Sequence, residues 1–124
     1  FVGMGAYIDQ PAHALSYGQQ KLVELAQVLM LDPKLIMLDE PAGGINPTLI
    51  ARLGETIREL NAQGKTFLIV EHNMPFVLGL CVPVLVLARG KRIAAGGPDE
   101  IQRDPQVLDA YLGEDFVLEQ AVKA

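Results

Sequence analysis

The sequence of 124 residues predicts an α/β fold, with a mostly parallel sheet, helices beside it and a C-terminal β-hairpin. Two short and largely apolar runs, Leu35–Leu38 and Lys65–Val70, each lead into charged residues. Such runs are typical of strands buried on both faces of a parallel sheet. A stretch with leucines at helical spacing separates them, which is the order of a β-α-β unit. Further along, Arg89-Gly90-Lys91 lies between two apolar runs and predicts a hairpin turn.

The N-terminal part of the chain predicts a loop followed by a helix. Residues 1–14 have weak periodicity and predict a loop with a short helical turn. Ser16, followed three residues later by Gln19, is a capping box. Apolar residues then recur at helical spacing until Asp32, where an Asp-Pro pair ends the helix. We therefore expect Ser16 and Gly18 in or beside the first turn of a helix.

The first strand is followed by a polar loop and a second helix. Asp39 and Glu40 lie where the strand emerges, and residues 42–45 form a tight loop. Asn46 can cap the next helix, which has a proline at its first position. An apolar stripe follows until Gly64, which ends that helix.

The remaining predicted elements are short, and the sequence has no internal repeat. In chain order they are a helix over Met74–Leu80, a strand over Val82–Ala88, a strand over Arg92–Ala95, a helical turn over Asp99–Arg103 and a last helix capped at Asp104-Pro105 and closed by Gly113. The tail from Glu114 onward predicts a loose helix.

The composition is that of a globular protein, with 50% hydrophobic and 20% charged residues. The net charge is -5 and no Lys/Arg cluster stands out, so nucleic acid is not an expected partner. The single cysteine, Cys81, excludes a disulfide within this chain, and its apolar neighbours predict a buried small side chain. No apolar run approaches the ~20 residues that span a bilayer. The chain begins with Phe1 rather than Met, and we expect it to be a piece of a longer protein.

Three polar features align at the ends of the predicted elements. Adjacent carboxylates at the end of a strand, here Asp39 and Glu40, suit a hydrated metal ion and an activated water. A neutral imidazole after the next strand, at His72, could contact a γ-phosphate or the attacking water. The exposed N–H groups and dipole of the helix that opens near Ser16 and Gly18 make a phosphate site.

Each of these features also has a plain structural interpretation. Asp39 and Glu40 precede a proline and could form an ordinary polar turn. Ser16 could serve only as a helix cap, and His72 could be an ordinary loop histidine. The alignment of the three features along one chain is what favours a functional site.

Taken together, these residues resemble the ATP-binding subunits of ABC transporters. Leu15-Ser16-Tyr17-Gly18-Gln19 looks like the signature motif of that family, and Leu35–Pro41 looks like its Walker B strand with the catalytic glutamate. Ala42–Asn46 looks like the D-loop, and His72 looks like the switch histidine. The stretch at residues 109–114 resembles the branch that imports branched-chain amino acids.

The resemblance implies a role for each residue. Glu40 and His72 would be catalytic, with Glu40 deprotonating the attacking water and His72 contacting the γ-phosphate. Asp39 would hold Mg²⁺ through a bound water. The residues that would bind ATP held by the opposite subunit are Ser16, Tyr17, Gly18 and Gln19, and Asn46 would link the two sites.

The resemblance also implies cofactors, partners and a location. The cofactors would be ATP and Mg²⁺. The partners would be a second ATP-binding subunit, in a homodimer or a heterodimer, and transmembrane permease subunits. The longer protein would be a transport-coupled ATPase bound peripherally to the cytoplasmic face of the cell membrane.

The sequence departs from the family pattern at several positions. Tyr17 stands where the commonest signature has Gly, Asn46 where most D-loops have Asp, and Val82 where many relatives carry an acidic residue. The largest departure is that no Gly-x-x-x-x-Gly-Lys-Ser/Thr phosphate loop occurs in these residues. Gly64-Lys65-Thr66 imitates its end, but Glu59 stands where the first Gly belongs, and the segment closes a helix instead of opening one.

We therefore expect the C-terminal half of an ATP-binding domain. Residues 1–33 would be the remnant of a helical subdomain, residues 34–112 half of the α/β core and residues 113–124 a tail. We expect this part alone neither to bind nor to hydrolyse ATP. Two alternatives stay open, a non-catalytic binding or regulatory module of the same fold and an unrelated phosphotransfer domain with Asp39 as nucleophile.

Overall fold

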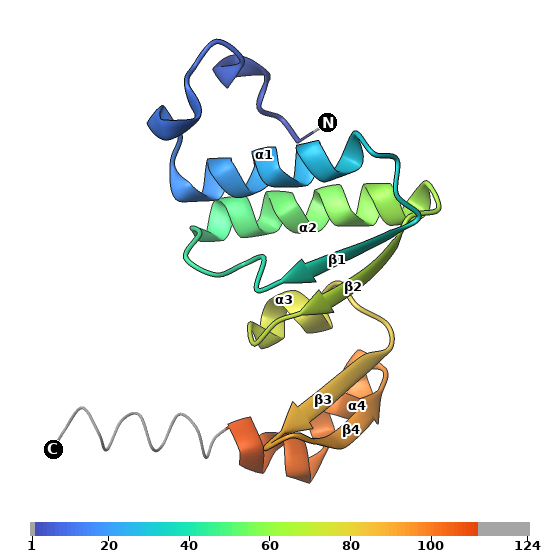
Figure 1. The fold of residues 1–124 in the computed structure, drawn as a ribbon. Helices are drawn as coiled ribbons and strands as arrows, with labels where there is room; N and C mark the ends of the chain where they lie inside the picture. Colours follow the sequence, from blue (N-terminus) through green and yellow to red (C-terminus); the bar gives the residue numbers. More distant parts are fainter. Residues whose placement is uncertain (1, 112–124) are drawn as a thin grey trace, which may run out of the picture. The chain divides into compact units, whose positions relative to one another are not determined.

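The computed structural model describes residues 2–111, and the chain divides into two compact units, residues 1–80 and residues 81–124 (Figure 1). The first unit contains two 3₁₀ turns, three helices and two strands among its described residues. Its elements are η1 (Gly5–Tyr7), η2 (Ala12–Ala14), α1 (Tyr17–Leu29), β1 (Leu35–Asp39), α2 (Pro47–Ala62), β2 (Thr66–Val70) and α3 (Met74–Leu78). The second unit contains β3 (Val84–Ala88), β4 (Lys91–Gly96) and α4 (Pro98–Arg103), and residues 105–111 are also helical.

The first unit is built on a β-α-β motif. Strands β1 and β2 pair in parallel, with Leu35 opposite Thr66 and Asp39 opposite Val70. Helix α2 connects them, and the side chain of Asn46 caps it by accepting a hydrogen bond from the N–H of Leu49 at 3.0 Å. Because the strands are parallel, their carboxyl ends meet at the same edge of the sheet.

Helix α1 begins as the sequence predicts. The Ser16 side chain accepts from the Gln19 N–H, and the Gln19 side chain accepts in return from the Ser16 N–H. The helix ends at Leu29, ahead of Asp32, whose backbone is left-handed with φ 47°. The loop expected at residues 1–14 carries the short turns η1 and η2.

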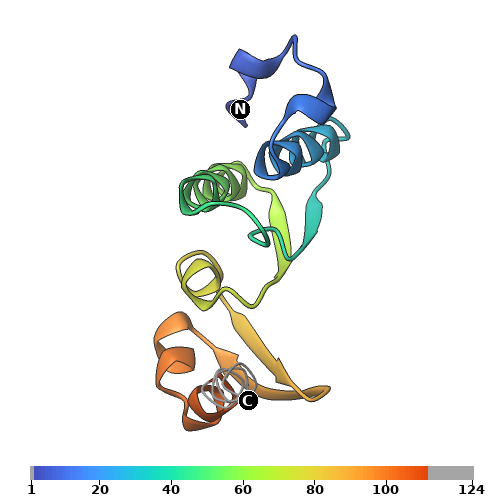
Figure 2. The ribbon, with the colours of Figure 1, turned by 90° about the vertical axis from the view of Figure 1, so that its left-hand side faces the viewer.

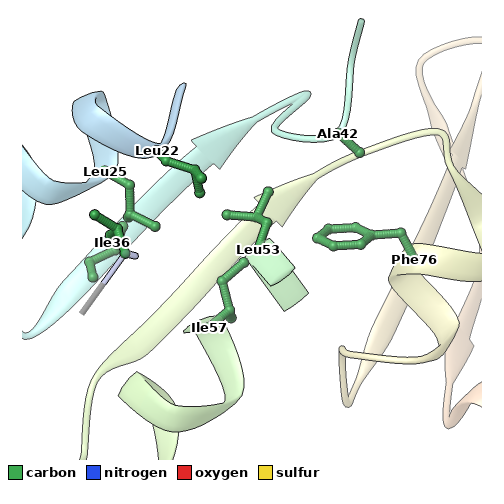
Figure 3. Packing of buried hydrophobic residues seen from close by; sticks show 8 residues of the cluster. Leu22, Leu25, Ile36, Ala42, Leu53, Ile57 and Phe76 are labelled. Carbon is green, nitrogen blue, oxygen red and sulfur yellow. The ribbon is translucent and has the colours of Figure 1, made fainter. Parts of the chain in front are cut away.

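One hydrophobic core holds the first unit together. Leu22 and Leu25 from α1, Ile36 from β1, and Leu53 and Ile57 from α2 pack against one another (Figure 3). Val2, Ala42 and Phe76 complete the buried cluster. Ala42 belongs to the loop that follows β1, so the core anchors that loop directly.

The strands of the first unit are covered on one face only, which corrects the prediction that they are buried on both. Ile36 is 2% exposed, whereas its neighbour Met37 is 69% exposed. Leu68 and Val70 of β2 are exposed in the same way. The reason is that the helices packing on this sheet lie on one side of β1 and β2 (Figure 2), so alternate side chains face solvent.

The segment Gly64-Lys65-Thr66 has the context expected for it. It follows α2 and leads into β2, and Gly64 has φ 94°, as helix ends often require. The Lys65 ammonium forms an ion pair with the Asp32 carboxylate in the loop before β1. Lys65 is therefore a structural residue, and this segment is not a phosphate loop.

The second unit contains the predicted hairpin. Strands β3 and β4 pair antiparallel, and Arg89 and Gly90 form the turn with φ 49° and 74°. Strand β3 begins at Val84 instead of Val82, while β4 extends beyond the predicted Arg92–Ala95 in both directions. The described residues thus contain one parallel strand pair, in the first unit, and one antiparallel pair, in the second unit.

Several smaller predictions have mixed outcomes. Helix α3 ends at Leu78, two residues before the predicted end, and Cys81 is half-buried instead of fully buried. The predicted close of the last helix at Gly113 and the tail from Glu114 lie outside the described residues. The boundaries proposed at residues 33 and 112 stay predictions. No helix within residues 2–111 is long and apolar enough to cross a membrane.

Candidate functional site

The end of β1 turns sharply at Glu40. Its N–H donates to the Val70 carbonyl at 2.8 Å, which extends the strand pairing by one residue. Its backbone is left-handed, with φ 45°, which is uncommon for a residue other than glycine. Its carbonyl accepts from the Gly43 N–H at 3.0 Å. These bonds on both sides of Glu40 hold a backbone shape that the residue would not favour alone.

Glu40 and His72 meet at this edge of the parallel pair. His72 Nδ1 lies 3.5 Å from Glu40 Oε1, and both side chains are largely exposed. The sequence placed these residues after two different strands, and the parallel register brings them together. A carboxylate and an imidazole at this separation can both contact one water molecule.

Asp39 and Glu40 also line a shallow hollow of about 480 Å³. The other lining residues are Tyr17, Lys21, Gly43 and Gly44. The N-terminal part of α1 therefore lines the same hollow as the carboxylates of Asp39 and Glu40. Lys21 bonds to Glu24 at 3.1 Å, and this hydrogen bond is the main reason that the pKa of Lys21 is raised. Its ammonium also lies 5.4 Å from the centre of the Tyr17 ring.

The signature-like stretch at the start of α1 has two kinds of residue. Ser16 and Tyr17 are exposed, and the first intrahelical bond runs from the Gln20 N–H to the Ser16 carbonyl. The Tyr17 and Gly18 N–H groups precede that bond, so they belong to the helix N-terminus that favours anions. Gln19 is half-buried and occupied in the capping box.

Gly18 is buried where α1 approaches the loop and helix after β1. A Cβ at this position would lie 2.7 Å from Leu49 Cδ1 and 3.0 Å from Ile45 Cγ2. A side chain here would therefore require Leu49 and Ile45 to move, and glycine allows the close packing without that movement.

Asn46 is exposed and acts as the cap of α2, so its side-chain oxygen is already bonded. Of the residues predicted for the site, Tyr17, Asp39 and Glu40 line the same hollow. His72 lies close to Glu40. The structure places Ser16 and Gln19 in a helix cap, Gly18 in packing and Asn46 in a second cap.

Glu71 is a further residue at this edge of the sheet, and the sequence pattern did not predict a role for it. Its side chain has 0% exposed surface and accepts hydrogen bonds from the N–H groups of Ala42, His72 and Asn73 at 2.8–2.9 Å. The sequence feature that could have marked Glu71 is its position directly after β2. Glu40 has the same position after β1. Lys21 was missed as well, because nothing in a helical pattern marks one lysine as lining a hollow.

The described residues offer a metal ion few ligands. No group of three or more His, Cys, Asp or Glu side chains among residues 2–111 could hold one. Asp39 supplies a single exposed carboxylate at the end of β1. Such a site fits Mg²⁺ better than Zn²⁺ or Ca²⁺, because Mg²⁺ keeps several waters and needs only one or two carboxylates besides substrate phosphates.

Comparison with protein families gives two matches along the chain. Residues 2–43, which include the start of α1 and the end of β1, match the model of the ABC transporter family. Residues 91–117 match the model of the branched-chain amino acid ATP-binding cassette transporter.

Comparison with curated proteins gives relatives over most of the chain. The chain is 42% identical over 108 residues to the lipopolysaccharide export system ATP-binding protein LptB of Acidithiobacillus ferridurans, covering 87% of this chain and 45% of that protein. It is 40% identical over 114 residues to the high-affinity branched-chain amino acid transport ATP-binding protein LivG of Salmonella typhimurium, covering 91% and 45%. The chain thus spans a little under half the length of these relatives.

Solved structures share the fold. An ATP-binding cassette of an ABC transporter in its ADP conformation superposes with a TM-score of 0.81 at 37% identity, covering 90% of this chain and 46% of that one. The structure of cbiO1 from Clostridium perfringens, part of the ABC transporter complex cbiONQ, superposes with a TM-score of 0.75 at 31% identity, covering 96% and 49%. The motifs, the relatives and the fold agree: the chain belongs to the ATP-binding proteins of ABC transporters and is similar to their branched-chain amino acid branch.

Proposed function

We propose that this chain is the part of an ABC importer subunit that carries its ATP-hydrolysing residues. The observation that supports this most directly is the 3.5 Å separation of Glu40 Oε1 and His72 Nδ1 at the carboxyl edge of the parallel strands. General-base chemistry requires such side chains within reach of one water. The proposal extends to the longer protein, because this chain spans less than half of its relatives.

In the proposed reaction, water attacks the γ-phosphorus of ATP and ADP leaves. Glu40 accepts the proton of the attacking water, and His72 donates a hydrogen bond to a γ-phosphate oxygen as charge redistributes. Asp39 is the residue that would hold Mg²⁺, which neutralises phosphate charge when bound. The exposed positions of Glu40 and His72 leave both side chains open to a nucleotide that arrives from outside the unit.

The start of α1 would act on a different nucleotide. We propose that Ser16, Tyr17, Gly18 and Gln19 bind ATP anchored by a second ATP-binding subunit. The Ser16 hydroxyl can still donate a hydrogen bond, since in the cap it only accepts one. Asn46 would link the two sites from the loop that joins β1 to α2.

The transported substrate that we propose is a branched-chain amino acid. The match over residues 91–117 and the LivG relatives support it. The similarity to LptB, whose name assigns it to lipopolysaccharide export, means that overall identity alone does not select the cargo. The partners would be a second ATP-binding subunit and transmembrane permease subunits, at the cytoplasmic face of the membrane.

The test is Glu40→Gln in the full-length protein, assayed by phosphate release and by nucleotide binding. We expect turnover to fall by ~10²–10⁴, since general-base removal has effects of that size, while ATP binding is kept. Turnover within threefold of wild type would remove Glu40 from the mechanism. A wild-type protein that binds ATP without hydrolysing it would favour the alternative, a non-catalytic module of the same fold.

A further inference from the structure

A buried carboxylate lies behind the exposed pair of Glu40 and His72. The Glu71 side chain has 0% exposed surface, although the residue as a whole is half-buried, so the exposed part is backbone. A buried carboxylate without partners would be strongly unfavourable. Here three backbone N–H groups donate to it, so the charge is satisfied within the fold.

The three donors come from two different loops. Glu71 Oε1 accepts from the Ala42 N–H at 2.8 Å, in the loop that follows β1. Glu71 Oε2 accepts from the His72 N–H at 2.8 Å and from the Asn73 N–H at 2.9 Å, in the loop that follows β2. One side chain therefore ties together the two loops that carry Glu40 and His72.

The hydrogen bonds of Glu71 hold the backbone near Glu40 and the backbone at His72. Glu40 has a left-handed backbone, and Ala42 is two residues further along the same turn. His72 directly follows Glu71, and its Nδ1 lies 3.7 Å from Glu71 Oε2 and 3.5 Å from Glu40 Oε1. Because neither Glu40 nor His72 is held by burial of its own side chain, their separation depends on the two backbones that Glu71 connects.

We propose that Glu71 is a positioning residue that sets the distance between Glu40 and His72. It does not touch the nucleotide, and it acts by holding the β1 and β2 loops in register. This inference rests on the proposed function, since the pair it positions is the proposed hydrolytic pair. A displacement of about 1 Å in such a pair can lower a rate by up to ~10²-fold.

Glu71→Gln is the informative change because it preserves the length of the side chain. An amide has one acceptor oxygen, so its NH₂ group must face either the Ala42 N–H or the N–H groups of His72 and Asn73. The variant therefore loses either the hydrogen bond to the loop after β1 or the hydrogen bonds to the loop after β2, and the two loops are no longer connected. The matched control is Glu59→Gln, at an exposed position on α2.

The first measurement is amide hydrogen exchange on the 124-residue chain. We expect Glu71→Gln to lose protection at Ala42, or at His72 and Asn73, and Glu59→Gln to leave all three unchanged. Unchanged protection in Glu71→Gln would overturn the proposed connection without any reference to activity.

The second measurement is steady-state ATP hydrolysis by the full-length protein. We expect Glu71→Gln to lower kcat about tenfold or more while KM changes less than about twofold. If Glu71 acts through Glu40, the double variant Glu40→Gln/Glu71→Gln is no slower than Glu40→Gln alone. Additive effects, or a lower Tm with unchanged kcat, would show a structural role only and overturn the proposal.

The two proposals fail in different ways. A wild-type protein and a Glu59→Gln control that both lack hydrolysis would contradict the proposed function, and the positioning role would fall with it. Hydrolysis that is lost in Glu40→Gln but fully kept in Glu71→Gln would contradict the positioning role alone.

Discussion

His72 is 76% exposed as a side chain, so little of the unfolding free energy depends on its imidazole. Its position is set by its backbone, which Glu71 holds, and by its closeness to Glu40. An exposed side chain in a fixed place is what a contact with an incoming phosphate needs.

In the full-length protein we expect His72→Ala to slow hydrolysis by about 10²-fold, as loss of one transition-state donor does. ATP affinity should change much less, since the contact matters most as charge redistributes. Phosphate release and nucleotide binding measured on the same preparation check this. Equal loss of ATP and ADP affinity with unchanged turnover would identify a structural histidine instead.

The residues of the site differ in how well the sequence predicts them. Asp39 ends β1, and Glu40 and His72 lie just beyond β1 and β2. Because the parallel register places the two strand ends together, the closeness of Glu40 and His72 was predictable. Glu71 was not predictable, because an exposed and a buried carboxylate after a strand look alike in sequence. The structure shows that N–H groups from the loops after β1 and β2, such as those of Ala42 and Asn73, donate to the Glu71 carboxylate. The sequence does not show how these two loops run in space.

Between elements, Lys65 and Asp32 connect the loops that enter β2 and β1. The Lys65 hydrogen bond and charge hold the pKa of Asp32 below its ordinary value of 3.8. A carboxyl whose pKa is lower in the folded state stabilises that state above its unfolded pKa. The stabilisation is lost as the pH falls from 3.8 through the folded pKa.

We therefore expect Asp32→Asn to have a slightly lower Tm than wild type near neutral pH, with the difference vanishing as the pH falls below 3.8. High salt should also reduce the difference, because the carboxylate is exposed. Thermal unfolding of both proteins across this range measures it, with Asp9→Asn as an exposed control. A difference that is constant with pH would assign the effect to the backbone of Asp32 instead.

At the level of elements, the sequence predicted the order and type of helices and strands. It did not predict that helices cover only one face of the parallel strands. Capping at Ser16 and Asn46 marked both long helices because a cap is a local feature. The prediction that β1 is buried on both faces was wrong. An apolar run shows that a strand can be buried, but it does not show that other elements pack on both faces of the sheet. The shift of β3 to Val84 is a boundary effect of one or two residues.

At the scale of the whole chain, the exposed face of β1 and β2 favours self-association. Leu35, Met37, Leu68 and Val70 form an exposed apolar surface on β1 and β2. Exposed apolar strands favour pairing with another chain. We expect the 124-residue chain alone to self-associate, and Met37→Glu to shift it toward monomer. Sedimentation velocity measures both, and only monomer at high micromolar concentration would contradict the expectation.

We expect this chain to supply hydrolytic residues to a nucleotide whose phosphates are anchored elsewhere. A helix N-terminus such as that of α1 contributes ~0.3–1 kcal/mol at an exposed site. Even millimolar affinity requires about 4 kcal/mol. The Asp39 and Glu40 carboxylates repel triphosphate, and the sequence has no Gly-x-x-x-x-Gly-Lys-Ser/Thr loop to offset that repulsion.

The most direct measurement is calorimetric titration of the 124-residue chain with Mg-ATP. We predict that the 124-residue chain neither binds nor hydrolyses ATP at submillimolar nucleotide. We expect the full-length protein to bind ATP and to hydrolyse it. A dissociation constant of about 10 μM for this chain, equivalent to about 7 kcal/mol, would contradict this expectation. So would hydrolysis by this chain that is lost in Glu40→Gln, since either result would require a phosphate-binding loop within these residues.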